Sequence, residues 1–239
     1  MPEAQSIHVR VPATTANLGP GFDCLALSLD IWNEVELCFK GNSLLIEIVG
    51  EGQGSLPTDQ SNLVFQTIEM LAHAYQIELP AGVYIRCQNR IPVSSGLGSS
   101  SSAIIAGLLG GSNLLGIATS KIQLLELGYE LEGHLDNLAA CLCGGFTIAV
   151  MQDRTVKVSR IDIKDINVLI ALPDVILSTQ DARRVLPQKV SLKDAVFNVG
   201  RTALLVSAFC QNDLDWLKVA MEDRLHQPYR YELIPAVQE

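Results

Sequence analysis

The chain has 239 residues and a mass of 25.9 kDa, which is enough for one large domain or two small ones with an ample core. Hydrophobic residues make up 48% and charged residues 18%, a balance typical of globular proteins rather than disordered ones. The net charge of −9 argues against a partner that is nucleic acid, because phosphate-backbone binders are basic.

The apolar segments and the cysteines indicate the cellular compartment of the protein. The most apolar segment, residues 103–116, is interrupted by Gly, Ser and Asn and is too short to span a membrane. The first ten residues lack the apolar core of a signal peptide. The six cysteines show no paired CxxC spacing, so we interpret them as buried, reduced thiols. We expect a cytoplasmic protein with no membrane partner.

The first half of the chain predicts strands followed by a helix. Alternating Ile7, Val9 and Val11 indicate a strand that runs into an irregular stretch, ATTANLGPGFD. Residues 33–39 and 43–50 predict a strand pair joined by turn residues at 40–42. Residues 61–77 carry a helical stripe, with Ser61 or Asn62 as the cap.

The second half alternates strands and helices. A strand is predicted around residues 83–87, helices over 102–116 and 119–133, the latter opened by Thr119, and a short apolar strand over 167–173. Residues 191–209 predict an amphipathic helix that begins with a capping box of Ser191 and Asp194. Charge density rises near residues 153–165, which suggests a boundary there. The overall pattern favours an α+β architecture.

The stretch PVSSGLGSSSS, residues 92–102, lies between the strand at 83–87 and the helix at 102–116. Free backbone N–H groups at a helix start form an anion site, and Gly96 and Gly98 allow the backbone to approach a phosphate. The stretch has no Lys for a Walker loop, and Ser101 occupies the third glycine position of a Rossmann fingerprint. Spacing alone leaves phosphate binding and a tight structural turn as equal alternatives.

The same stretch, extended to PVSSGLGSSSSAI, is similar to the central motif of the GHMP small-molecule kinases, PxxxGLGSSAA, and departs from it at Ser101 and Ser102. Two further segments resemble the homoserine kinase branch of that superfamily, VPATTANLGPGFDCLALSLDIWNEV and EGHLDNLAACLCGGF. STQDARRVLP and DRLHQPYRYELIP continue the resemblance. Five segments in the correct order make it highly specific.

The resemblance implies the GHMP kinase fold, with an N-terminal ATP-binding domain of the ribosomal protein S5 domain 2-like type over residues 1–155. A ferredoxin-like C-terminal domain is expected over residues 156–239. Family members continue into a third motif rich in Gly and Ser that this sequence does not contain. We therefore expect the C-terminal domain to be incomplete, and an inactive nucleotide-binding remnant is the alternative to an active kinase.

The resemblance also implies that ATP and Mg²⁺ bind at the motif. Backbone amides would wrap the phosphates along Pro92, Val93, Ser94, Ser95, Gly96, Leu97, Gly98, Ser99, Ser100, Ser101 and Ser102. Ser100, or Ser99, would help to hold Mg²⁺ together with a carboxylate from the helix that precedes the DN motif of Asp136 and Asn137, Glu130 as first choice and Glu132 as second. A solvated helix face is the alternative for either Glu. Replacing Gly98 by Val is expected to weaken ATP binding while leaving the fold largely intact.

For the other substrate, the resemblance implies a site for L-homoserine. Its residues would be Asn17, Asp23, His134, Asp136, Asn137, Thr179, Arg183 and Arg230. Asp136 would meet the ammonium, and Arg183 and Arg230 the carboxylate, since a guanidinium binds carboxylate through paired charge-assisted bonds. Without the resemblance, residues 13–23 would be a turn and the arginines solvated surface charges.

The implied reaction is transfer of the γ-phosphoryl group of ATP to the homoserine hydroxyl, in threonine biosynthesis. Phosphoryl transfer requires mainly in-line positioning and charge stabilisation, so we assign no general base. A GHMP kinase for another metabolite, such as mevalonate or galactose, fits the two arginines less well. Relatives in the superfamily are often dimers, so a homodimer is a further expectation.

Overall fold

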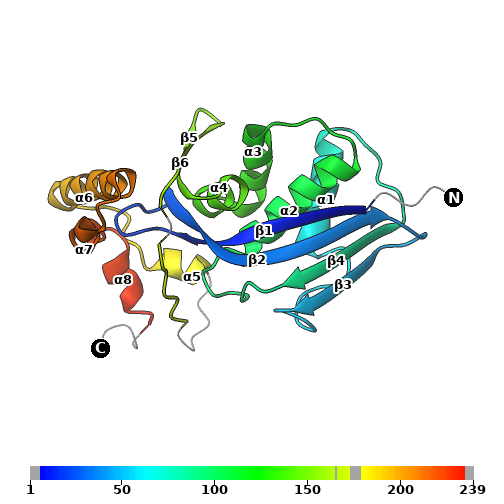
Figure 1. Ribbon diagram of the computed structural model, residues 1–239, viewed down its shortest axis with the longest axis horizontal. Helices are drawn as coiled ribbons and strands as arrows, with labels where there is room; N and C mark the ends of the chain where they lie inside the picture. Colours follow the sequence, from blue (N-terminus) through cyan, green and yellow to red (C-terminus); the bar gives the residue numbers. More distant parts are fainter. Residues whose placement is uncertain (1–5, 165, 173–178, 235–239) are drawn as a thin grey trace.

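The computed structural model describes residues 6–164, 166–172 and 179–234. Strands and short helices alternate in the first two thirds, and helices alone follow (Figure 1). In chain order the elements are β1 (Ser6–Ala16), β2 (Leu25–Phe39), β3 (Leu45–Gly50), α1 (Leu63–Ala74), β4 (Val83–Asn89), α2 (Ser99–Leu114), α3 (Lys121–Glu132), α4 (Asp136–Cys143), β5 (Phe146–Gln152), β6 (Thr155–Ile161), α5 (Thr179–Arg184), α6 (Leu192–Gln211), η1 (Leu214–Trp216), α7 (Leu217–Ala220) and α8 (Gln227–Tyr231). The α+β content agrees with the prediction.

A six-stranded sheet is built around the long strand β2. One edge of β2 pairs with β1 in antiparallel fashion along nearly its whole length. The other edge pairs with β5 near the start of β2 and with β4 near its end. β3 lies parallel to β4, and β6 pairs with β5, so the order is β3-β4-β2-β5-β6 with β1 on the opposite side of β2.

The predicted pairing of residues 33–39 with 43–50 is wrong, because β4 lies between these two strands. β4 buries Val83, Ile85 and Cys87, whereas β3 leaves Leu45 and Val49 exposed. The strand with the fully buried apolar face takes the interior position, and β3 becomes an edge strand. The turn at residues 40–42 therefore leads into β3 without forming a hairpin, and a crossover through α1 then brings the chain back to β4.

Two other strand predictions need correction. β1 continues to Ala16, across a bulge at Pro12 and Ala13, so the irregular loop begins only at Asn17. No strand forms over residues 166–172, where Leu169 is 95% exposed, and residue 173 lies outside the described residues. β-propensity alone does not make a strand there, and the segment pairs with no described strand.

The helix boundaries follow their capping residues. The side-chain oxygen of Asn62 accepts the first amides of α1, and Ser191 caps α6, as predicted. Helix α3 begins one residue later than predicted, because Ser120, not Thr119, forms a capping box with Gln123. Among the described residues, no helix is long and apolar enough to cross a membrane.

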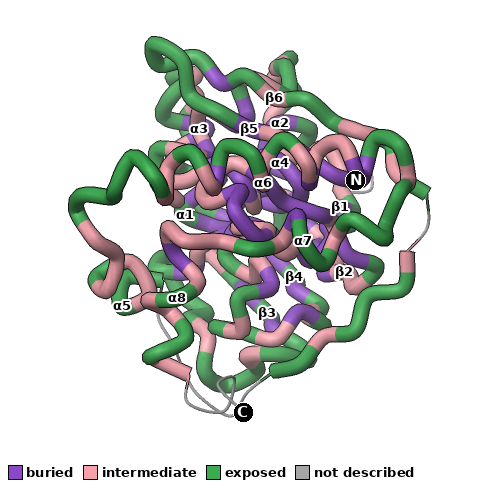
Figure 2. Tube along the Cα trace, turned by 90° about the vertical axis from the view of Figure 1, so that its left-hand side faces the viewer, coloured by how far each residue is buried: buried purple, intermediate pink, exposed green. Residues whose placement is uncertain are grey.

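Two buried clusters hold the molecule together. The larger one lies between the sheet and helices α1 to α4. The smaller one packs Leu25 and Phe146 of the sheet against Leu205 and Phe209 of α6, which lies across one end of the sheet (Figure 2). The sheet itself continues through β6 to Ile161, beyond residue 155, and the division into two domains stays a prediction.

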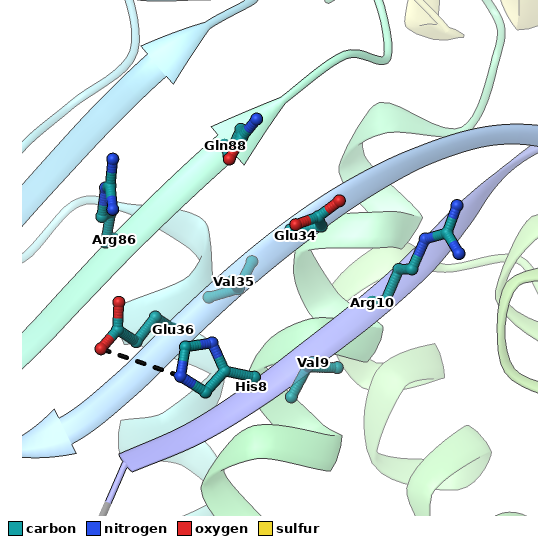
Figure 3. A pocket seen from close by; sticks show the side chains of 8 residues that line it. All are labelled: His8, Val9, Arg10, Glu34, Val35, Glu36, Arg86 and Gln88. Atoms are coloured by element: carbon teal, nitrogen blue, oxygen red, sulfur yellow. Dashed lines mark ion pairs between the residues drawn. The ribbon is translucent and has the colours of Figure 1, made fainter.

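The opposite face of the sheet is polar. Val9 and Val35 point toward the helices, while the neighbouring residues of the same strands point outward around a shallow depression of about 380 Å³ (Figure 3). Its charged rim mixes both signs: His8, Arg10, Arg86, Glu34 and Glu36. Strand alternation thus places these side chains on the face that no described helix covers.

The cysteines are free, and Cys38, Cys87 and Cys141 are buried as expected. Cys210 is exposed, which the sequence interpretation missed.

Candidate active site

A cleft of about 970 Å³ joins the Ser/Gly stretch to segments far away in the sequence. Its walls come from the β4–α2 connection, the end of α3, the start of α4, and helices α5 and α8. The predicted site residues that line it are Asn17, Pro92, Val93, Ser94, Ser95, Gly96, Gly98, Ser99, Ser100, Ser102, His134, Asn137, Thr179, Arg183 and Arg230. Segments from Ala16 near the start of the chain to Ile234 near its end therefore contribute to one cavity.

Residues 92–98 form a loop, called here the phosphate loop, that ends at the N-terminus of α2. Gly98 is the N-cap of α2 at φ +70° and makes no side-chain cap. The first amides of a helix have no intrahelical acceptor, so those of α2 are available to a ligand. Because α2 has 16 residues, its dipole adds a positive field at this end.

Gly98 is also required for packing inside the protein. A Cβ at this position would lie 2.0 Å from Thr14 Oγ1, which donates a 2.7 Å hydrogen bond to Asn137 Oδ1. A Cβ at Gly96 would meet nothing within 4 Å. The expectation that Gly98→Val spares the fold is therefore wrong, since the added side chain collides with a β1 residue before it reaches any ligand.

Two members of the predicted phosphate site point into the protein. Leu97 is 7% exposed and belongs to the smaller core cluster, and its carbonyl accepts from the Thr14 amide. Ser101 is fully buried. Their side chains support the loop, and only their backbone can contribute to a ligand.

Asn33 on β2 fastens both ends of the phosphate loop. Its Oδ1 accepts the amides of Arg90 and Ile91 at 2.8 and 3.0 Å, just before the loop. Its Nδ2 donates to Ser102 Oγ at 3.1 Å, just after the loop. Asn33 is 5% exposed, so its bonds form in a largely water-free environment. Sequence reasoning did not single out this residue, because its partners lie 57 to 69 positions away in the chain.

The carboxylate beside the loop is that of Glu132. Ser100 Oγ donates to Glu132 Oε2 at 2.7 Å and Ser101 Oγ to Oε1 at 2.9 Å. Glu130 is exposed, because residues two apart on a helix do not share a face. The structure thus does not support the preference for Glu130. The spacing of Leu125, Gly128 and Glu132, by three and four residues, is a signal that could have identified the inward carboxylate.

Glu132, His134 and Asp136 form a row across the site. His134 Nδ1 lies 3.1 Å from Asp136 Oδ1, and its Nε2 lies 3.7 Å from Glu132 Oε1. The hydrogen bond to Asp136 raises the pKa of His134, and burial opposes this only in part. Asp136 is fully buried, and its Oδ2 has no hydrogen-bond partner among the described residues. Such an oxygen is suited to a cationic group of a ligand.

The loop of residues 17–23, called here the substrate loop, connects β1 to β2. Asn17 and Asp23 both adopt a positive φ, and Asn17 Oδ1 accepts the Asp23 amide at 3.0 Å. Asp23 itself holds Arg183 through two bonds of 2.9 and 2.6 Å. The predicted carboxylate-binding arginine is therefore paired, in this structure, with a carboxylate of the protein.

The second predicted arginine, Arg230, lies near the first. Burial lowers the pKa of Arg230, and the positive charge of Arg183 lowers it further. Both guanidinium groups lie over the ring of Phe22, at 5.0 Å for Arg230 and 5.5 Å for Arg183. Phe22, which the sequence reasoning did not single out, thus gathers two like charges at a place where an anion would relieve their repulsion.

A site for Mg²⁺ would need few protein ligands. Among the described residues, no three His, Cys, Asp or Glu side chains gather as a metal site. Mg²⁺ binds through one or two carboxylates with phosphates and waters, and Ser100 and Glu132 offer two adjacent hard oxygen ligands at the phosphate loop. The residues present fit this cation.

Comparisons with known proteins agree with this geometry. Residues 62–145 match the GHMP kinases N terminal domain. The homoserine kinases of Carboxydothermus hydrogenoformans and Microchaete diplosiphon are 40% and 41% identical to this chain over 96% and 98% of its length, which corresponds to 75% and 77% of those proteins. The crystal structure of homoserine kinase from Cytophaga hutchinsonii matches all of this chain and 78% of its own, with a TM-score of 0.83 and 30% identity.

The fold and the phosphate loop define a kinase of the GHMP superfamily. A phosphomevalonate kinase from Streptococcus pneumoniae, only 14% identical with a TM-score of 0.66, shares the fold alone. Within the superfamily, this chain belongs to the homoserine kinase family.

Proposed function

We propose that this protein transfers the γ-phosphoryl group of ATP to the side-chain hydroxyl of L-homoserine, giving O-phospho-L-homoserine and ADP in threonine biosynthesis. The observation that carries the proposal is that one cleft joins a phosphate-binding helix start to two arginines that Asp23 and Phe22 hold together. The helix start suits the nucleotide, and the charged groups suit both ends of an amino acid.

Homoserine would enter by exchanging partners with an existing ion pair. Asp23 and Arg183 neutralise each other when the site is empty of substrate, each with side chains about one third exposed. A zwitterion brings a carboxylate for Arg183 and an ammonium for Asp23, so both groups keep an opposite charge during the exchange. Arg230 would then add a second donor to the carboxylate, and the buried Oδ2 of Asp136, which has no hydrogen-bond partner among the described residues, would meet the ammonium.

The phosphate loop would hold the nucleotide through its backbone. The uncapped amides of α2 bind the phosphate oxygens, and Gly96 leaves the approach open. Ser100 and Glu132 would hold Mg²⁺, which supplies charge neutralisation for the phosphates when it is bound. Because the reaction depends on in-line positioning and charge stabilisation, no residue is assigned as general base.

A coupled assay of ADP release tests the proposal. Turnover is expected with L-homoserine in the presence of MgATP, and not with mevalonate or galactose, since neither brings an ammonium to Asp23 and Asp136. ATP binding by calorimetry without turnover of any of the three would instead favour a nucleotide-binding protein without this activity.

A homodimer is proposed from the family resemblance, and a cytoplasmic location from the reduced cysteines that the sequence predicts. Light scattering on the purified protein would decide the oligomeric state.

A further inference from the structure

His226 lies in the segment between α7 and α8 and reaches across to the substrate loop. Its side chain is almost fully buried, at 3% exposed, and its Nε2 lies 2.6 Å from the carbonyl oxygen of Gly19. A carbonyl can only accept, so Nε2 carries the proton and donates it to Gly19. Nδ1 is buried without a hydrogen-bond partner among the described residues, and burial lowers the pKa of His226.

The same ring packs against the residue that gathers the two arginines. The ring centroids of His226 and Phe22 are 5.1 Å apart, with an interplanar angle of 29°. Phe22 in turn carries the guanidinium groups of Arg183 and Arg230 within cation–π distance. One side chain therefore fixes a carbonyl of the substrate loop and supports the ring beneath the carboxylate-binding pair.

His226 is itself held in place by Asp223. The carboxylate of Asp223 accepts the amides of Leu225, His226 and Gln227, and it also accepts from Asn198 of α6. The backbone around the histidine is thus fastened to the long C-terminal helix. Nothing in this arrangement touches the cleft directly, since His226 is not among the residues that line it.

The substrate loop also approaches this segment closely through its backbone. A Cβ added at Gly19 would lie 2.7 Å from the Cα of Met221. Thr202 Oγ1 donates to the carbonyl of Pro20 at 3.3 Å. The loop is therefore docked on the C-terminal part of the chain at Gly19 and Pro20. Of the two hydrogen bonds there, the one from His226 is the shorter.

We propose that His226 is a positioning residue for the amino-acid substrate: it fixes the substrate loop through Gly19 and, through Phe22, the orientation of Arg183 and Arg230. The inference rests on the proposed function, because it assumes that these two arginines bind the substrate carboxylate. His226 acts through other residues and has no part in binding ATP.

Two variants separate the two contacts of the ring. His226→Phe keeps an aromatic ring against Phe22 and removes the donor to Gly19, while His226→Gln keeps an amide donor at similar reach and removes the ring. His73→Phe is the matched control, because His73 is exposed on α1. KM for homoserine and for ATP, kcat, the melting temperature, and hydrogen exchange of the amides of residues 17–25 are measured for each.

We expect His226→Phe to raise KM for homoserine about tenfold, as the loss of one buried hydrogen bond implies, with KM for ATP changed less than about twofold. Amide exchange in residues 17–25 should become faster, and His226→Gln should show a smaller change in both measurements. His73→Phe should match the unaltered protein. If both His226 variants lower the melting temperature but leave loop exchange and KM for homoserine unchanged, His226 is only a packing residue and the inference is overturned.

An experiment that disproves the proposed function can be told apart from one that disproves the role of His226. If the unaltered protein does not phosphorylate homoserine, the function is wrong, whereas the exchange rates of residues 17–25 still decide whether His226 fixes the loop.

Discussion

The phosphate loop and the substrate loop are both short glycine-containing connections beside one cleft, but they are held by different parts of the molecule. The phosphate loop is fastened by Asn33 of β2 and Thr14 of β1, within the sheet and its helices. The substrate loop is fastened by residues beyond position 179, among them Arg183 and His226. Binding of the nucleotide and binding of the second substrate should therefore respond to different substitutions.

The residues that match the GHMP kinases N terminal domain, 62–145, include the whole phosphate loop and none of the C-terminal residues that fasten the substrate loop.

The largest expected effect concerns the fold around the phosphate loop. Gly98→Ala places a Cβ against Thr14 and forces a side chain into positive φ, so the free energy of unfolding should fall by about 3 kcal/mol. Gly96→Ala, with positive φ but open space, should cost about 1 kcal/mol. Urea unfolding of both variants measures the difference. An equal loss of unfolding free energy in the two variants would show that the side chain of Thr14 moves aside without cost.

On the substrate side, Arg183→Gln should raise KM for homoserine about a hundredfold. The substitution removes the charged guanidinium that makes two bonds to Asp23 in this structure and would bind the substrate carboxylate in the same way. KM for ATP should stay within about twofold. Arg184→Gln is the matched control, because Arg184 is exposed and its bond to Asp181 lies on the surface. A similar rise in both variants would contradict the assignment of Arg183.

On the nucleotide side, Asn33→Leu should raise KM for ATP about thirtyfold, because it leaves the amides of Arg90 and Ile91 buried without an acceptor. Asn33→Asp keeps the acceptor oxygen and should raise KM for ATP less than Asn33→Leu does. KM for homoserine should change little in either variant. Asn113→Leu, on the exposed side of α2, serves as the control. Equal changes in the two KM values would mean that the two loops are not independently held.

Sequence reasoning predicted those parts of the site that are marked locally. The strand, Ser/Gly loop and helix order around residues 83–114 is confirmed, and so are the caps at Asn62 and Ser191, because turn and capping chemistry act over a few residues. It missed Asn33 and His226, whose partners are 58 and 207 positions away.

The errors have the same origin. The strand order around β4 depends on which strand buries its apolar face best, a competition that no single segment reveals. The clash behind Gly98 depends on a residue 84 positions earlier in β1, Thr14, and local backbone freedom gives no warning of it.

The smallest expected effect concerns His134, which lies between the two sides, in contact with Asp136 and near Glu132. Because the folded state raises the pKa of His134, its protonated ring stabilises the fold fully below the unfolded pKa, and this contribution is lost as the pH rises through the folded pKa.

The unaltered protein should therefore exceed His134→Gln in free energy of unfolding by more at about pH 5.5 than at about pH 8.5. Urea unfolding at both pH values measures this difference, with His73→Gln, on the exposed face of α1, as the control. A gap that stays constant or widens toward high pH would mean that the ring of His134 is neutral in the folded protein.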